Sequence, residues 1–318
     1  MTALSTRWST SIGLTVPIVN APMGGAAGGA LAAAVSRAGG LGMIGLGSTG
    51  SVPGLETELR HLSGLGRPFG IGLVDWVVAR QPALLTAALD SRPTLLAVSF
   101  GDNSGWVRRA HDEGILAAAQ IADLDEARRA VDAGVDVVIA RGAEAGGHGA
   151  PRIGTLPLLA EVLEELAIPV LAAGGIGSGR ALAAVLAAGA AGAWIGTAFA
   201  ACTEALTPEW ARTVLLDAAD TDTVTTRVFD VVQRYPWPAE LPERVVRNGF
   251  VDRWCGLEDQ LAADDDACAA QAAAAAAGDH TLAAVNAGQG VGSLRSVRGA
   301  AAVIADLTAD ARRLLDRW

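Results

Sequence analysis

Lysine is absent from this chain of 318 residues, and its absence excludes several enzyme classes at once. All 24 basic residues are arginine. Without a lysine amine the protein cannot form the Schiff base that lysine-dependent aldolases and pyridoxal phosphate enzymes require. It cannot carry a Walker A phosphate loop either, because that motif needs a lysine after its glycines.

Cysteine, aromatic side chains and charge are also scarce. Cys202, Cys255 and Cys268 lie far apart without CxxC spacing, so we expect neither a disulfide framework nor a thiolate zinc site, and we predict no metal site. Aromatic residues make up 4% of a chain that is 51% hydrophobic, which favours a large aliphatic core. The net charge of −10 argues against binding to nucleic acid or to an anionic membrane.

One uncharged segment, residues 181–203, is long enough in principle to span a membrane. Its glycines at 189, 192 and 196 and its weakly apolar alanines instead favour a buried helix, a turn and a strand. The first 19 residues contain no apolar core of the kind that a signal peptide has. We therefore expect a soluble, cytoplasmic protein with no membrane partner, and we leave a homo-oligomer open.

Eight short apolar segments recur at fairly even spacing in the first 200 residues. Each is rich in valine, isoleucine or leucine and apolar on both faces, as buried parallel strands are. They are residues 18–23, 41–46, 69–74, 95–100, 115–121, 135–140, 170–173 and 193–199. Segments with helical periodicity lie between them, at residues 28–38, 54–62, 81–90, 104–112, 123–133, 156–166 and 180–188. This alternation predicts an α/β fold, a (β/α)8 TIM barrel.

A doubly wound sheet is the structural alternative, but its GxGxxG signature after the first strand is not convincingly present. The strand pattern ends after Ala201. Residues 204–280 contain four prolines and the alanine-rich segment 267–277. We predict a mainly helical subdomain at 204–280, inserted after the eighth strand. The barrel would comprise residues 1–203 and 281–318, with a last amphipathic helix near 299–318 closing it.

In a barrel the active site lies at the C-terminal ends of the strands. After the seventh strand, Gly174, Gly175 and Gly177 would let backbone N–H groups approach a phosphate, and the next helix offers its positive N-terminus. After the eighth strand, Gly196 and Thr197 would close the pocket, with the threonine adding a hydroxyl group. The alternative is that these glycines only allow strands and helices to pack closely.

His148 is the only one of the four histidines that we place at a strand end, in a glycine-rich loop with no bulky neighbour. It is either a reactive group at the barrel mouth or a surface-loop histidine. Glu144 could accept a hydrogen bond from it or simply be solvated. Met23 could pack against a flat ring or be barrel filler, and Gln120 could donate to a ring carbonyl or be a solvated strand end.

Five segments together resemble the nitronate monooxygenase family, once called 2-nitropropane dioxygenases. They are APMGG at 21–25, GAEAGGH at 142–148, AGGI at 173–176, IGT at 195–197 and GQGVG at 288–292. The wider group includes the flavin-dependent enoyl-acyl-carrier-protein reductases, which share most of these motifs. The resemblance covers the barrel and resumes near residues 247 and 288.

The resemblance implies FMN as the cofactor, with the isoalloxazine ring near residues 21–23 and the phosphate in the loops after strands seven and eight. The implied cofactor-binding residues are Ala21, Pro22, Met23, Gly24, Gly72, Gln120, Gly146, Gly174, Gly175, Gly196, Thr197 and Gln289. Gln120 stands where many members carry a lysine near the N1–C2 carbonyl edge of the ring. Residues 70–76 replace a strand end that contains asparagine in many members.

By the same resemblance, the protein would use O2 to oxidise alkyl nitronates, and nitroalkanes as well, to carbonyl compounds and nitrite. His148 would be the base that removes the α-proton of a nitroalkane, or a donor that holds the nitro group of a nitronate. Imidazole suits both roles because its reference pKa is about 6.5. Two alternatives stay open: an NAD(P)H-dependent FMN reductase of enoyl thioesters or quinones, and a non-catalytic FMN-binding barrel.

Overall fold

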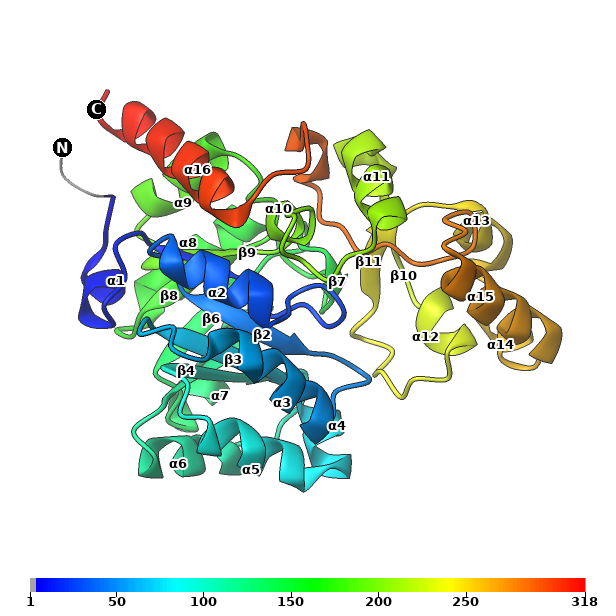
Figure 1. Ribbon diagram of the computed structural model, residues 1–318, viewed down its shortest axis with the longest axis horizontal. Coiled ribbons are helices and arrows are strands. Elements are labelled where there is room, and N and C mark those ends of the chain that lie inside the picture. The colour runs from blue at the N-terminus through cyan, green and yellow to red at the C-terminus, as the bar shows by residue number, and fades with distance from the viewer. Residues whose placement is uncertain (1–3, 318) are drawn as a thin grey trace.

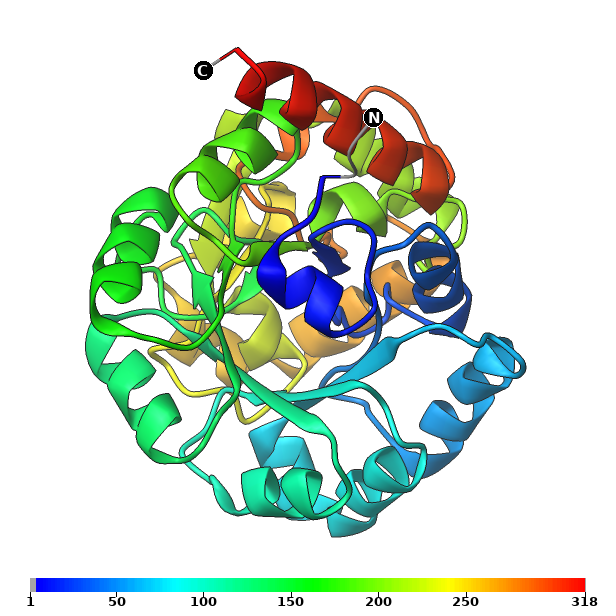
Figure 2. The same cartoon turned by 90° about the vertical axis from the view of Figure 1, so that its left-hand side faces the viewer.

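The protein is built around a barrel of eight parallel strands enclosed by helices (Figure 1, Figure 2). This computed structural model describes residues 4–317. The strands are β1 Ile18–Asn20, β2 Gly42–Leu46, β3 Phe69–Val74, β4 Leu95–Ser99, β5 Leu116–Ile121, β6 Val137–Arg141, β8 Val170–Ala173 and β9 Gly192–Ile195. They pair in the order β1-β9-β8-β6-β5-β4-β3-β2. Each lies in or overlaps one of the eight apolar segments, so the predicted TIM barrel is confirmed.

A buried side chain completes the barrel between β1 and β2. The two strands share one parallel bridge, from Val19 to Leu41. Next to it, the Asn20 carboxamide donates to the Met43 carbonyl at 2.9 Å and accepts from the Met43 N–H at 2.8 Å. Asn20 is fully buried. Its amide therefore takes the place of a peptide group in the ladder and pairs backbone groups that would otherwise be orphaned.

The helices around the barrel also follow the sequence pattern, except the short helix at residues 75–80, which the sequence did not predict. They are α2 Gly29–Arg37, α3 Val52–Leu59, η1 Arg60–Leu62, α4 Asp75–Arg80, α5 Pro82–Asp90, α6 Gly105–Asp112, α7 Leu124–Asp132, α8 Thr155–Glu165, α9 Gly179–Ala187 and α16 Ala300–Leu315. Ser51, Asp123 and Ser178 cap α3, α7 and α9, each accepting the N–H of the residue three positions later. α16 packs on α9 and α2, so it closes the helical ring as predicted.

The N-terminal end of the barrel is covered by α1 Arg7–Ser11, which lies across the near end in Figure 2. Trp8 of this helix is buried against interior side chains that include Leu14 and Val19. The opposite end, where the strands finish, carries the long loops.

No helix within residues 4–317 is both long and apolar enough to cross a membrane. The uncharged segment 181–203 forms most of α9, then β9 and the short helix α10 Thr197–Ala200. This is the predicted order of helix, turn and strand.

The insertion is mostly helical but contains two strands that the sequence pattern did not predict. Its helices are α11 Glu209–Asp217, η2 Asp220–Asp222, α12 Val228–Val232, α13 Gly249–Trp254, α14 Glu258–Ala262 and α15 Asp265–Ala277, and a further turn, η3 Val291–Ser293, follows it. β10 Thr223–Thr226 pairs antiparallel with β11 Glu243–Val246. β11 also pairs with β7 Gly147–His148, which belongs to the loop after β6.

The small sheet β10-β11-β7 joins the insertion to the mouth of the barrel (Figure 1). The insertion has its own apolar cluster, which includes Val228, Phe229, Phe250 and Trp254. The two short strands do not stand out in the sequence, because strands of four residues with threonine, glutamate and arginine carry too little apolar pattern. The boundaries at 204 and 280 stay a prediction.

Candidate active site

A cavity of about 490 Å³ opens at the C-terminal ends of the barrel strands. Small residues make room for it inside the barrel. Gly45 and Gly72 lie against Pro22 so closely that an added Cβ on either would collide with the 22–23 backbone or the proline ring. These glycines therefore let the segment after β1 lie across the barrel mouth and form one wall of the cavity.

All but one of the implied cofactor residues line this cavity. They are Ala21, Pro22, Met23, Gly24, Gly72, Gln120, Gly146, Gly174, Gly175, Gly196 and Thr197. Gln289 is the exception, because its side chain is exposed whereas Gly288 and Gly290 line the cavity. The Gln289 N–H donates to the Glu144 carbonyl at 2.8 Å. This segment therefore presents its backbone to the site, and the role of Gln289 in cofactor binding stays a prediction.

Unpaired donors gather on one side of the cavity. Within residues 4–317, the backbone N–H groups of Gly175, Ile176 and Gly196 have no protein acceptor. The Thr197 Oγ1 accepts the Gly288 N–H at 3.0 Å, which leaves its own O–H free to donate. Several donors on two neighbouring loops therefore face one space, an arrangement that suits an anion such as a phosphate.

The glycines around this space have two different explanations. Gly146 and Gly174 are needed for packing, since an added Cβ would lie 2.6 Å from the Ala287 carbonyl carbon and from the Thr155 Oγ1, respectively. Gly196 is not. Its φ is −99°, and an added Cβ would meet only the Met23 Sδ at 3.4 Å and the Ala21 Cβ at 3.8 Å. No protein neighbour requires glycine at 196, so the open space in front of it fits a ligand group.

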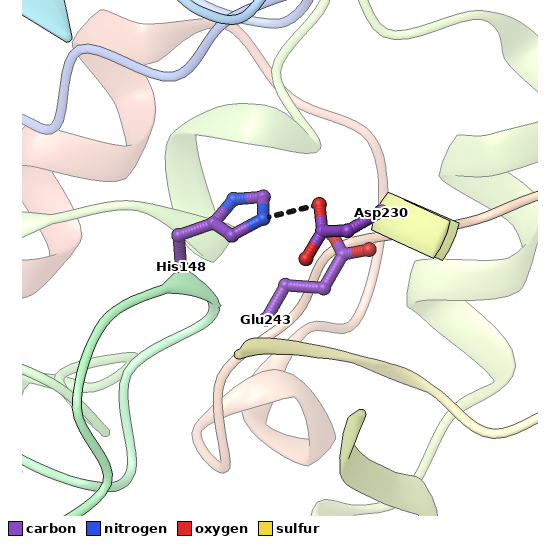
Figure 3. Close-up of side chains that lie close together, drawn as sticks. All are labelled: His148, Asp230 and Glu243. Atoms are coloured by element: carbon purple, nitrogen blue, oxygen red, sulfur yellow. Dashed lines mark hydrogen bonds and ion pairs between the residues drawn. The ribbon is translucent and has the colours of Figure 1, made fainter. Parts of the chain in front are cut away.

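His148 lies in β7 and lines the cavity. Its Nε2 is hydrogen-bonded to the Asp230 Oδ1 of α12 at 2.8 Å (Figure 3). Its ring stacks on Trp237, with centroids 3.6 Å apart and 6° between the planes. The expectation of a histidine without bulky neighbours was wrong, because the insertion supplies this indole. The Glu144 carboxylate bonds elsewhere and accepts the N–H and O–H of Thr155, both at 2.8 Å.

Trp237 is itself fixed by its surroundings. Its Nε1 donates to the Ser48 Oγ at 3.0 Å. Trp76 and Phe100 pack edge-on against it, with centroid separations of 5.7 and 5.2 Å. The plane of the His148 imidazole is therefore set by an aromatic surface that is anchored on several sides.

A buried carboxyl pair lies beside the imidazole (Figure 3). Glu243 is the ladder partner of His148 across β11 and β7, and the Asn286 amide donates to its Oε2 at 2.9 Å. Burial raises the pKa of Glu243 to about 7, although the neighbouring His148 opposes this change. The second oxygen of Asp230, Oδ2, has no hydrogen-bond partner among the described residues.

One ligand atom from each of His148, Asp230 and Glu243 lies within 4.8 Å of the other two. Atoms this close could surround a metal ion. The contact between Nε2 and Oδ1, at 2.8 Å, is however that of a hydrogen bond, and we interpret the cluster as a group that shares protons. Sequence reasoning missed both carboxyl groups and Trp237, because they follow His148 by more than 80 residues with no local pattern linking them.

Arg141, at the end of β6, adds a buried positive charge to the cavity lining. Its Nη2 donates to the carbonyls of Ala145, Gly146 and Gly147, at 3.3, 3.2 and 2.9 Å. Burial lowers the pKa of Arg141 to about 10, so the guanidinium remains charged at neutral pH. The residue therefore holds the loop that leads to His148.

The fold and the cavity define the class: a (β/α)8-barrel enzyme with a donor-rich pocket at its strand ends and a histidine–carboxyl cluster on the pocket rim. Known proteins agree with this class. The family model described as nitronate monooxygenase matches residues 5–83 and 76–310. The chain therefore belongs to the nitronate monooxygenase family and is a flavin-dependent oxidoreductase.

Two relatives illustrate the range of names in this group. A nitronate monooxygenase of Paraburkholderia phytofirmans is 34% identical over 255 residues, which cover 65% of this chain and 69% of that protein. A Rhodococcus jostii protein named as a hydroxy-methyl-oxo-octahydro-indene-carboxyl-CoA dehydrogenase is 30% identical over 263 residues, covering 79% of this chain and 68% of that protein.

Solved structures extend the similarity to nearly the whole chain. FabK from Thermotoga maritima has a TM-score of 0.85 and 26% identity, covering 98% of this chain and 97% of that one. A nitroalkane oxidase from Streptomyces ansochromogenes has a TM-score of 0.83 and 33% identity, covering 96% and 99%.

Proposed function

We propose that this protein binds FMN and uses O2 to oxidise alkyl nitronates, and nitroalkanes as well, to carbonyl compounds and nitrite. The observation that carries the proposal is that His148, backed by Asp230, lines the same cavity as the unpaired donors near Gly175 and Gly196. A base and an anion cradle at one barrel mouth are what a flavin enzyme that deprotonates its substrate requires. The names of two similar proteins, a nitronate monooxygenase and a nitroalkane oxidase, support the substrate class.

The residues present fit FMN. The free N–H groups of Gly175, Ile176 and Gly196 and the hydroxyl group of Thr197 would hold the phosphate. Pro22 and the residues beside it would lie against the flat ring system. When bound, FMN supplies the redox chemistry by accepting electrons from the substrate and passing them to O2.

His148 would act on the substrate through the ring nitrogen that does not face Asp230. With a neutral nitroalkane, that nitrogen would take the α-proton and leave the electron pair in the nitronate. With a nitronate already formed, the protonated imidazole would donate a hydrogen bond to a nitro oxygen. Trp237 would keep the ring plane fixed in both cases, because it stacks face to face on the imidazole.

Positive charge near the ring would come from Arg141. Gln120 lines the cavity but is neutral, and it occupies the position where the family resemblance implies a lysine in many members. The Arg141 guanidinium, buried on the neighbouring strand, places a full charge in the same cavity. We propose that it partly replaces the missing lysine in favouring an anionic ring.

The test of this function begins with the purified protein. A flavin absorption spectrum and release of FMN on denaturation would support the cofactor, whereas FAD or no flavin after reconstitution would contradict it. A nitronate added without O2 should bleach the flavin, and readmitted O2 should restore the colour and release nitrite. A flavin that stays oxidised with several nitronates would contradict the substrate class.

An NAD(P)H-dependent reductase acting on a thioester is the second candidate. It is favoured by the Rhodococcus relative, whose name specifies a CoA thioester. Anaerobic addition of NADH or NADPH separates the two candidates. Rapid bleaching by either nucleotide, together with inertness to nitronates, would favour the reductase.

A further inference from the structure

We propose that Asp230 fixes the tautomer of His148, so that Nε2 carries the proton and Nδ1 is the atom that accepts the substrate proton. The inference rests on the proposed function in one respect, namely that His148 is the base. The inference assigns a positioning role to Asp230, a residue of the insertion that lies 82 positions after His148 in the sequence.

The first argument is the geometry of the hydrogen bond. A neutral imidazole has one N–H and one lone pair, and a carboxylate can only accept. The contact of 2.8 Å between Nε2 and the Asp230 Oδ1 therefore requires the hydrogen on Nε2. Nδ1 is then left with the lone pair, and no group among residues 4–317 forms a hydrogen bond to it.

The second argument is that neither partner can easily move. Asp230 is only 5% exposed, and its helix α12 is packed through Val228, Phe229 and Val232 into the insertion's apolar cluster. On the other side, stacking on Trp237 holds the imidazole plane. A flip of the ring about its Cβ–Cγ bond would put the Cε1 carbon in place of Nε2, give up the hydrogen bond and leave Asp230 buried without a partner on either oxygen.

The third argument concerns charge. When Nδ1 takes a proton, the substrate C–H bond breaks, a new N–H bond forms and the electron pair stays on the substrate as a nitronate. The imidazolium then lies beside the Asp230 carboxylate, which offsets its charge in a buried setting. Burial raises the pKa of Glu243 to about 7, so below that pH it is mostly neutral and adds no second negative charge beside this pair.

The tautomer can be measured directly on the purified, flavin-loaded protein. In protein labelled with 15N-histidine, the chemical shifts of the ring nitrogens distinguish the Nε2–H from the Nδ1–H tautomer at a pH where the imidazole is neutral. His148→Gln identifies the signals of His148 among the four histidines. We expect the Nε2–H form in the wild type and a loss of that preference in Asp230→Asn.

The chain offers a matched control. On the outside of the barrel, His111 Nε2 and the Asp136 Oδ2 form a second histidine–aspartate pair at the same distance, 2.8 Å, with both side chains partly exposed. Asp136→Asn should change only the signals of His111. It should leave the His148 signals and the turnover of nitroalkanes as they are in the wild type.

Steady-state kinetics provide a second test of the inference. Asp230→Asn should lower kcat/KM for a neutral nitroalkane by about 10²–10⁴-fold, the range over which general bases contribute, while the preformed nitronate of the same compound loses far less. Asp230→Glu, which keeps a carboxylate, should recover part of the loss.

Three results would overturn the inference. The first is an Nδ1–H tautomer in the wild type, which decides the matter even if the variants do not fold. The second is an equal loss on nitroalkane and nitronate in Asp230→Asn. The third is a metal ion retained by the purified protein, with activity lost to a chelator and restored by that metal. The NMR result does not depend on which substrate is used, so a failure of the nitronate assignment alone is told apart from a failure of this inference.

Discussion

Glu243→Gln should flatten the dependence of protein stability on pH. In the native protein burial raises the pKa of Glu243 from 4.5 to about 7, so the folded state holds a proton that the unfolded chain releases at lower pH. The free energy of unfolding therefore falls as pH rises from about 4.5 to about 7. Above that range the contribution of Glu243 to it no longer changes with pH. At about 1.4 kcal/mol for each pKa unit, the loss is on the order of 3 kcal/mol.

The glutamine variant removes this titration because an amide cannot ionise. It keeps an oxygen that can accept the hydrogen bond from the Asn286 amide, which in the wild type measures 2.9 Å. The variant should gain stability relative to the wild type between pH 5 and pH 8, and the gain should approach the full 3 kcal/mol only near the upper end.

Urea denaturation at pH 5, 6, 7 and 8 is the assay, with the free energy of unfolding compared between the two proteins at each pH. Glu209→Gln, at an exposed position on α11, is the control for removing a carboxylate and should run parallel to the wild type. Parallel curves for Glu243→Gln and the wild type would refute the reasoning, because they would mean that Glu243 is ionised in the folded protein throughout.

Three further outcomes can be measured. Gly196→Asp should give a folded protein that has lost its flavin, because a carboxylate would occupy the proposed phosphate site while the added Cβ meets no atom closer than 3.4 Å; a normal flavin content would place the phosphate elsewhere. His148→Ala should lower kcat/KM for nitroalkanes by about 10²–10⁴-fold and affect nitronates less, with FMN content retained; no loss on either substrate would end its catalytic role. Asn20→Ala should lower the free energy of unfolding by about 2–6 kcal/mol, since it orphans the Met43 N–H and carbonyl at about 1–3 kcal/mol each; unfolding indistinguishable from the wild type would show that water replaces the amide.

The barrel could be predicted from sequence because its strands are buried on both faces. Segments such as 69–74 and 170–173 are therefore almost continuously apolar, and capping residues such as Ser51, Asp123 and Ser178 mark where several helices begin. The strands of the insertion gave no such signal. β10 reads TVTT and β11 reads ERVV, and a four-residue strand in a small sheet need not be apolar.

The candidate site was predictable in part for the same reason. Glycine-rich segments that follow strands place their backbone at the barrel mouth wherever the barrel closes, which located Gly175, Gly196 and His148 in one cavity. The partners of His148 were not predictable. Asp230 and Trp237 reach it only through the pairing of β7 with β11, which is a tertiary contact without a local sequence pattern.

The pairing of β7 with β11 brings together two parts of the chain that contribute different groups to the site. The donors that would hold the cofactor belong to loops of the barrel, whereas Asp230 and Trp237, which contact the proposed base His148, belong to the insertion. The barrel loop and the insertion are joined here by a ladder only two residues long, with Gly147 and His148 on one strand and Arg244 and Glu243 on the other. Substitutions in the insertion would therefore alter the surroundings of the proposed base without changing the loops proposed to hold the cofactor, so substrate preference and cofactor binding could change separately.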